Sequence, residues 1–192
     1  MIKDSLIHFW DSWYRKGRSS GAGSSGDERK LKIEFIKENC ADVKSILDIG
    51  CGDFQVGKEI CEIFPEAKYV GLDISENRIE RNCSKFKQYR FEKMSDYSSV
   101  SEFDAELILC IDVLFHQLDD SSYQELLQVL KTSSWKYLVL TEYDDAMITV
   151  YNGTDLKHRH FEPTVIGHEF VSIQIPYFTG HKWIYIFTRK YD

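Results

Sequence analysis

Several features that define other classes of protein are missing from this chain of 192 residues. It has no block of Lys and Arg, and its formal net charge is −7, so non-specific binding to a phosphate backbone is not favoured. No apolar run approaches the length of a membrane span. The first ten residues contain Asp4 and His8, which are atypical of a signal peptide. We therefore expect neither a nucleic-acid partner nor a membrane association.

Paired cysteines are missing as well. The five cysteines form no CxxC pair, and an odd number without paired spacing favours reduced thiols and a cytoplasmic location. His158 and His160 have no third Cys or His at an obvious ligand spacing, so no metal site is expected. A length of 192 residues suits one α/β domain spanning 1–192.

The most informative stretch that is present covers residues 45–53 and reads S-I-L-D-I-G-C-G-D. The apolar residues around Asp48 predict a buried strand, where a carboxylate costs free energy unless it is paired or hydrogen-bonded. Gly50 and Gly52 follow at once, and glycine is used where backbone bends sharply or touches a ligand. Residues 55–64 then predict a helix. Together these elements predict a nucleotide site in which backbone N–H groups face the ligand.

Two other interpretations of this stretch are open. A dinucleotide fingerprint, G-x-G-x-x-G, would place its third glycine at position 55, where the chain has Gln55. Asp48 would also add like charge beside a pyrophosphate, whereas it suits a ligand that carries a cation. These two residues argue against a nicotinamide oxidoreductase. An ordinary tight turn is the plainer alternative.

The run D-I-G-C-G-D, residues 48–53, resembles motif I of the class I S-adenosylmethionine-dependent methyltransferases. The resemblance implies that Asp48 serves the amino-acid end of the cofactor and that the two glycines lie beneath its sugar. Cys51 and Asp53 share this turn and are cofactor-binding candidates. The resemblance further implies an α/β fold with a Rossmann-like sheet of seven strands. Most of them would be parallel, with a C-terminal antiparallel hairpin and helices on both faces.

Two more carboxylates follow predicted strands. Asp73 ends the strand over 69–74, where a carboxylate can accept hydrogen bonds from both ribose hydroxyls of a nucleoside. The family resemblance assigns Asp73 to the ribose, and Ile74 beside it is a further contact. It assigns Asp96, after the strand over 89–94, to the adenine amino group. A helix N-cap for Asp73 and a plain turn residue for Asp96 are the alternatives.

The run I-D-V-L-F-H, residues 111–116, ends a predicted fourth strand and resembles motif IV of the same family. Ligands in open α/β sheets bind outside the carboxyl ends of the strands, which is where this run falls. We expect Asp112 to contact the cofactor and Phe115 to contact the methyl acceptor. His116 is the first candidate for a general base. The alternative is a histidine that caps the next loop.

Residues 1–26 are predicted to form an arm or lid in front of a core spanning 27–192. Trp10, Trp13 and Tyr14 lie at i, i+3 and i+4, which is one face of a short helix. Trp13 and Tyr14 are candidates to cover the cofactor, because aromatic faces attract a sulfonium cation. A helix that only packs on the core is the alternative.

The glycine-rich stretch 17–26 is expected to wrap the ligand, with Ser20 and Gly21 as contacts; a linker or a cloning scar is the alternative. The string from Tyr14 to Gly26 also resembles the leader of a group of small bacterial-type methyltransferases. Several members of that group accompany glycan-assembly enzymes.

The acceptor side is predicted to follow the fifth strand, over 135–142. Glu142 ends this strand and Tyr143 follows it, and both are candidate acceptor contacts. An irregular segment over 144–167 comes next, and two late strands, over 170–175 and 182–188, predict a hairpin.

The irregular segment contains K-H-R-H-F. We expect Arg159 to bind an acidic group and His158 and His160 to be further candidate bases, as in a substrate-binding loop. A solvated basic loop and a metal pair are the alternatives.

The sequence thus predicts a methyltransferase that uses S-adenosylmethionine and acts on a hydroxyl of a small molecule or glycan, with an acidic or phosphorylated acceptor. An N-methyltransferase and a non-catalytic, cofactor-binding partner subunit are the alternatives. The oligomeric state is not predicted.

Overall fold

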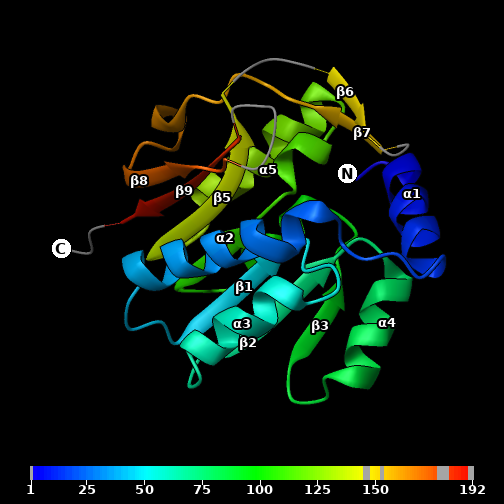
Figure 1. The fold of residues 1–192 in the computed structure, drawn as a ribbon, viewed down its shortest axis with the longest axis horizontal. Coiled ribbons are helices and arrows are strands. Elements are labelled where there is room, and N and C mark those ends of the chain that lie inside the picture. Colours follow the sequence, from blue (N-terminus) through cyan, green and yellow to red (C-terminus); the bar gives the residue numbers. More distant parts are fainter. Residues whose placement is uncertain (1, 145–147, 152–153, 177–181, 190–192) are drawn as a thin grey trace.

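Seven strands form one mixed sheet in the computed structural model, which describes residues 2–144, 148–151, 154–176 and 182–189 (Figure 1). The strands are, in spatial order, β3 (Arg90–Lys93), β2 (Lys68–Asp73), β1 (Ser45–Ile49), β4 (Leu107–Cys110), β5 (Tyr137–Tyr143), β9 (Lys182–Thr188) and β8 (Glu169–Gln174). The first five run parallel, and β9 is antiparallel to both of its neighbours. The predicted seven-stranded sheet with a late hairpin is confirmed.

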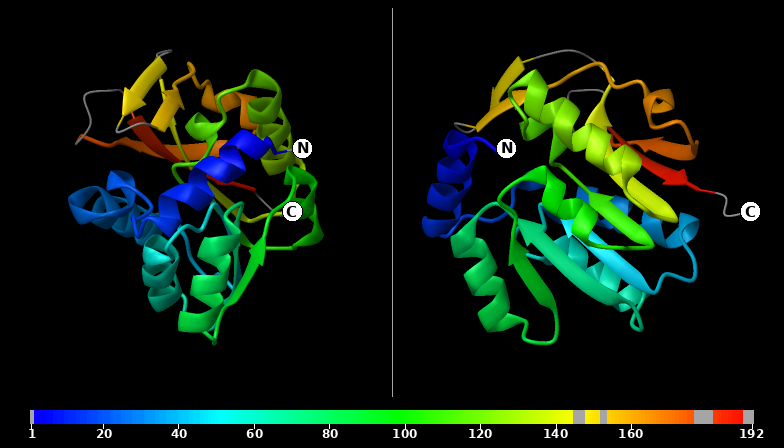
Figure 2. Two further views of the ribbon diagram at one scale, coloured as in Figure 1. Left: turned by 90° about the vertical axis from the view of Figure 1, so that its right-hand side faces the viewer. Right: turned by 180° about the vertical axis from the view of Figure 1, so that it is seen from behind.

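Helices cover both faces of the sheet, as expected (Figures 1 and 2). The α-helices are α1 (Asp4–Arg15), α2 (Gly26–Asn39), α3 (Gln55–Ile63), α4 (Glu76–Lys85) and α5 (Asp120–Thr132). Apolar side chains of α2, α3 and α4 share one core cluster, whereas those of α5 belong to a second cluster. The central strands β4 and β5 are buried along their whole length, because parallel strands with helices on both sides have no face in water.

The segment between β5 and β8 differs from the prediction of an irregular loop. It contains a separate antiparallel pair, β6 (Ile148–Tyr151) and β7 (Thr154–Lys157), and a short 3-10 helix, η4 (Pro163–Ile166). The sequence does carry the signal for a hairpin. An Asn-Gly dipeptide at 152–153 separates the runs I-T-V-Y and T-D-L-K, although positions 152 and 153 lie outside the described residues.

The arm is docked on the core and is not a linker. Helix α1 lies beside α4, and the Asp11 carboxylate accepts hydrogen bonds from Ser75 Oγ at 2.5 Å and from the Asn77 N–H at 3.3 Å (Figure 1). Arg81 donates to the carbonyl oxygen of Tyr14 at 3.3 Å. No helix in the described ranges is both long and apolar enough to cross a membrane.

Candidate cofactor and acceptor site

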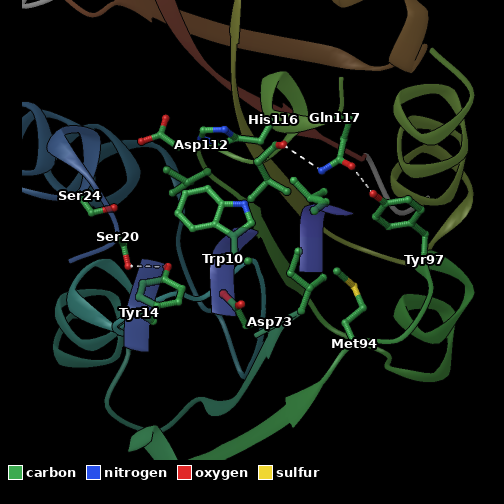
Figure 3. A pocket seen from close by; sticks show the side chains of 15 residues that line it. Trp10, Tyr14, Ser20, Ser24, Asp73, Met94, Tyr97, Asp112, His116 and Gln117 are labelled. Carbon is green, nitrogen blue, oxygen red and sulfur yellow. Dashed lines mark hydrogen bonds between the residues drawn. The ribbon is translucent and has the colours of Figure 1, made fainter. Parts of the chain in front are cut away.

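A cavity lies at the carboxyl ends of β1, β2 and β4, beneath α1 (Figure 3). Four parts of the chain line it: the arm, the turn after β1, the ends of β2 and β3, and the connection after β4. The lining residues are Leu6, Trp10, Tyr14, Ser20, Ser24, Gly50, Asp73, Ile74, Met94, Tyr97, Ile111, Asp112, Val113, His116 and Gln117. Seven of the predicted site residues meet here: Tyr14, Ser20, Gly50, Asp73, Ile74, Asp112 and His116.

The turn after β1 has room for glycine only. Gly50 has a φ of +73°, and a Cβ atom there would lie 2.5 Å from a methyl carbon of Val113. Gly52 has a φ of +49°, and a Cβ atom there would overlap Ser20 Oγ. Ser20 Oγ also accepts a hydrogen bond from the Asp53 N–H at 2.7 Å. The Ser/Gly stretch of the arm therefore closes directly onto the motif I turn.

Asp73 presents a buried carboxylate to this cavity at the end of β2. One oxygen accepts from the Gly52 N–H at 2.9 Å and the other from the Ser75 N–H at 2.8 Å. Burial raises the pKa of Asp73 to about 6, and these two hydrogen bonds hold it lower than burial alone would. Asp73 is therefore largely ionised at neutral pH, and each oxygen keeps acceptor capacity for a ligand hydroxyl.

An apolar wall adjoins Asp73. It consists of Ile74, Met94 and Tyr97, of which Met94 and Tyr97 are buried. The Tyr97 hydroxyl donates to Gln117 Oε1, and Gln117 Nε2 donates to the carbonyl oxygen of Val113 at 3.3 Å (Figure 3). Such a wall suits the flat face of a nucleobase.

Asp48 lies beneath the glycine turn rather than in the cavity wall. Its carboxylate accepts a hydrogen bond from the Tyr69 hydroxyl at 2.7 Å, and burial raises its pKa to about 7. Cys51 is buried on the same side, where its Sγ packs against Gly71. Neither side chain is among the lining residues.

Asp53 and Asp96 bind the protein's own backbone. Asp53 Oδ2 accepts from the Ser20 N–H at 3.2 Å and so fastens the arm to the turn. Asp96 caps the 3-10 helix η2 (Tyr97–Glu102) by accepting from the Ser99 N–H at 3.2 Å. Of the arm residues, Gly21 and Trp13 also lie outside the lining, and Trp13 donates to the Ser19 carbonyl at 2.7 Å.

Asp112 belongs to a buried network of two acids and two lysines. Lys32 Nζ lies 2.6 Å from one Asp112 oxygen and 2.7 Å from Glu28. Lys182 Nζ lies 2.7 Å from the other Asp112 oxygen and 2.6 Å from Glu28. The Thr141 hydroxyl donates to Asp112 at 2.8 Å. The two lysines hold the pKa of Asp112 well below its usual range despite burial.

The same network fixes the Ser/Gly stretch. Lys32 Nζ donates to the carbonyl oxygen of Gly23 at 2.9 Å, and a Cβ atom on Gly23 would overlap the Asp112 carboxylate. Asp112 itself has a φ of +59°, a strained conformation for a residue other than glycine. The network therefore holds arm, strand end and carboxylate in one arrangement.

His116 borders the cavity opposite Asp73, with the Trp10 indole between them (Figure 3). The two aromatic rings meet edge to face, with centroids 5.0 Å apart. Nδ1 of His116 is shielded from solvent and has no hydrogen-bond partner among the described residues. Burial lowers the pKa of His116 to about 4, and the Asp112 carboxylate offsets only part of this effect. The imidazole is therefore neutral at pH 7.

The other predicted catalytic histidines lie elsewhere. His158 is buried and stacks on Tyr143, with ring centroids 3.5 Å apart, and the Phe115 ring packs against both. His160 is exposed, and its Nδ1 lies 2.7 Å from the carbonyl oxygen of Asp144. The structure therefore does not bring the three histidines together around one space.

Arg159 and Glu142 also contact the protein rather than the cavity. The Arg159 guanidinium lies 2.9 Å from Asp120 at the start of α5 and covers the Tyr123 ring. Glu142 is fully buried and accepts from the Tyr143 N–H at 3.0 Å. Burial raises the pKa of Glu142 to about 8.

Several lining residues were not predicted: Leu6, Trp10, Ser24, Met94, Tyr97 and Gln117. The signal for Trp10 was present, because it shares the aromatic face of α1 with Trp13 and Tyr14. Ser24 lies in the Ser/Gly stretch that was expected to bind. Nothing in the sequence distinguishes Met94 or Gln117 from ordinary strand-end residues. Within the ranges that the structure covers, no group of three His, Cys, Asp or Glu residues is arranged to hold a metal ion.

Comparison with known proteins shows a similarity to methyltransferases. A family model described as a methyltransferase domain matches residues 47–138. A sterol 24-C-methyltransferase of Clavispora lusitaniae is 28% identical over 166 residues, which are 81% of this chain and 41% of that protein. The chain thus spans about two fifths of the length of this curated relative.

Solved structures share the fold. One is a 1,6-didemethyltoxoflavin-N1-methyltransferase of Burkholderia thailandensis, solved with S-adenosylhomocysteine. It has a TM-score of 0.70 and is 15% identical, and the match covers 97% of this chain and 88% of that chain. The N-methyltransferase NodS of Bradyrhizobium japonicum has a TM-score of 0.60 and is 18% identical, and the match covers 84% of this chain and 94% of that chain. The fold is that of Rossmann-like S-adenosylmethionine-dependent methyltransferases. Residues 47–138 of this chain match the model of a methyltransferase domain.

Proposed function

We propose that the protein transfers a methyl group from S-adenosylmethionine to a hydroxyl of a small molecule. The observation that carries the proposal is the meeting of three features in one cavity. Asp73 provides a carboxylate that can accept hydrogen bonds from ribose hydroxyls. The turn after β1 has room for glycine only, and His116 provides a neutral imidazole.

The residues present fit the cofactor. Asp73 would accept from the ribose hydroxyls, and Ile74, Met94 and Tyr97 would cover the adenine ring. Tyr14, Ser20 and Ser24, beside the glycine turn, offer hydroxyl groups to the amino-acid end. When bound, the cofactor supplies an electrophilic methyl group on a sulfonium.

The arm has to move for a ligand of this size to enter. With Trp10 in place, the cavity measures about 70 Å³, whereas ligand sites commonly enclose about 300 Å³ or more. Trp10 and Tyr14 come from the arm and stack on each other with centroids 5.7 Å apart. Outward movement of α1 would open the cavity, and its return would exclude water and fix the reacting groups in place.

His116 is the proposed base. Its neutral ring would accept the hydroxyl proton of the acceptor as the new oxygen–carbon bond forms. A pKa of about 4 is sufficient, because a hydroxyl oxygen that has gained a methyl group becomes a far stronger acid than the alcohol. His158 and His160 do not border this cavity, so we assign them no part in the proton transfer.

The proposed acceptor is a small molecule or the end of a glycan. An acidic or phosphorylated acceptor has less support, because Arg159 is bound to Asp120 and not directed at the cavity. Nitrogen is the second candidate for the methylated atom, since both similar structures named above are N-methyltransferases. A neutral amine needs no base, and this separates the two candidates.

The test combines binding with turnover. Calorimetry with S-adenosylhomocysteine measures the cofactor site, and a methyl-transfer screen over phenols, sugars, sugar phosphates and amines measures activity. We expect His116→Gln to keep the binding and to lose at least tenfold in kcat on a hydroxyl acceptor. Full activity of His116→Gln on an amine would establish N-methylation instead. Binding without turnover on any acceptor would support the partner-subunit alternative.

A further inference from the structure

A second cavity lies between α1 and the start of α5, directly beside the first. It measures about 220 Å³, and Leu6, Trp10, His116 and Gln117 line both cavities. His116 and Trp10 therefore stand at the junction, each with one side toward either space. A molecule in the second cavity would be separated from the first cavity by these shared side chains alone.

The walls of this second cavity are largely apolar and aromatic. Leu6, Phe9 and Trp10 come from α1, and Leu118 lies opposite, after the β4 connection. Phe9 and Trp10 meet edge to face, with centroids 5.3 Å apart. Leu118 is 43% exposed, so part of its apolar side chain is accessible to a ligand in this cavity. This lining would favour a planar, weakly polar ligand.

The polar rim carries no net charge for an ionic ligand. Lys3 lies 3.4 Å from the Asp119 carboxylate, so each neutralises the other. Asp119 also caps α5 by accepting from the Ser122 N–H at 2.9 Å. An anionic acceptor would have to displace Asp119 from Lys3, whereas a neutral one would leave the pair intact.

We propose that the second cavity binds the methyl acceptor, and that the acceptor is an uncharged aromatic molecule of one or two rings that carries a hydroxyl group. The proposal rests on the proposed methyltransferase function and names its substrate class. An apolar protein cavity of about 150 Å³ holds a benzene molecule, so about 220 Å³ suits this size. The hydroxyl would face the His116 ring, which lines both cavities.

The test uses a variant that fills the second cavity and a matched control on the same helix. Ser5 is exposed and lines only the second cavity, so Ser5→Trp would occupy it. His8 is exposed on α1 and lines neither, so His8→Trp is the control. Binding of 2-naphthol, 2-naphthoate and glucose 6-phosphate is titrated by saturation-transfer NMR, with S-adenosylhomocysteine present and its own affinity measured by calorimetry.

We expect wild type and His8→Trp to bind 2-naphthol within twofold of each other, and Ser5→Trp to bind it at least tenfold more weakly. The affinity for S-adenosylhomocysteine should stay the same in all three proteins. Equal 2-naphthol binding by Ser5→Trp, or tighter binding of glucose 6-phosphate than of 2-naphthol by the wild type, would overturn the proposal while cofactor binding is retained. If the wild type does not bind S-adenosylhomocysteine, the proposed function itself is overturned.

Discussion

The indole of Trp10 and the imidazole of His116 meet edge to face, with ring planes 89° apart. One ring comes from the arm and the other from the connection after β4, so the contact joins two distant parts of the chain. It also forms the wall between the two cavities. The arm is therefore part of the proposed site, and removing it should weaken ligand binding.

Trp10→Ala should weaken the binding of S-adenosylmethionine more than that of S-adenosylhomocysteine. Both ligands lose an aromatic cover, which is worth about 0.5–1.5 kcal/mol beyond the buried area. Only S-adenosylmethionine carries the sulfonium cation, whose attraction to an aromatic face adds about 0.5–2 kcal/mol. Calorimetry with both ligands measures the difference, with His8→Ala as the control. An equal loss for the two ligands would mean that Trp10 does not face the sulfonium.

Gly23→Ala should release the arm. A methyl group at this position would overlap the Asp112 carboxylate, so the Ser/Gly stretch could not keep its place beside Lys32. We expect faster protease cleavage near Gly21 and weaker cofactor binding, with cleavage in the wild type slowed by S-adenosylmethionine. Ser19→Ala, in the same stretch, is the control. Identical cleavage of Gly23→Ala and wild type would show that the stretch tolerates the change.

Asp73→Asn should weaken S-adenosylmethionine binding by about 1.5–3 kcal/mol, because a hydrogen bond to a charged acceptor is worth about that much. The amide keeps the shape of the carboxylate, so the backbone around Gly52 and Ser75 is disturbed less than by alanine. Burial raises the pKa of Asp73 to about 6, so wild-type affinity should also fall as the pH drops through 6. Calorimetry between pH 5 and 8 checks both statements. An affinity unchanged by the substitution would remove Asp73 from the site.

Local signals in the sequence were sufficient for the sheet and for part of the site. The strand, glycine turn and helix around Gly50, and the carboxylate of Asp73, depend on neighbours in the chain. The directions of Arg159 and His158 depend on distant partners, Asp120 and Tyr143, and no local pattern reveals them.

The contacts of Asp112 are equally long-range. Lys32 lies 80 residues before it in the chain, so their ion pair could not be inferred from spacing. The hairpin of β6 and β7 is different, because the sequence contains a local signal for it, the Asn-Gly dipeptide. The prediction of an irregular segment did not use this signal.

Lys182→Met should lower the free energy of unfolding by about 3–5 kcal/mol, because it leaves buried acids with one cation fewer. Adding Glu28→Gln restores the balance of one acid and one lysine, so the double variant should be less unstable than the sum of the single variants, by about 1–3 kcal/mol. Urea unfolding of the four proteins gives the coupling. Lys3→Met, which removes an exposed pair at 3.4 Å, is the control and should change stability by less than about 1 kcal/mol. Strict additivity would mean that Glu28 and Lys182 do not interact.

Glu142→Gln should stabilise the protein increasingly as the pH rises from about 5 to 8. Burial raises the pKa of Glu142 to about 8 in the folded state, whereas the unfolded chain releases this proton near pH 4.5. Between these values the folded state holds one more proton than the unfolded state, so wild-type stability falls as the pH increases. Glutamine cannot titrate and keeps an acceptor for the Tyr143 N–H.

The measurement is urea unfolding of wild type, Glu142→Gln and the exposed control Glu38→Gln at each pH. Asp48 and Asp73 also have raised pKa values, but they titrate in all three proteins, so the difference between variant and wild type isolates Glu142. That difference should grow by about 1 kcal/mol per pH unit, close to the limit of about 1.4 kcal/mol for one proton. A difference that stays constant from pH 5 to 8 would mean that Glu142 is already ionised in the folded protein. That result would contradict the raised pKa of Glu142.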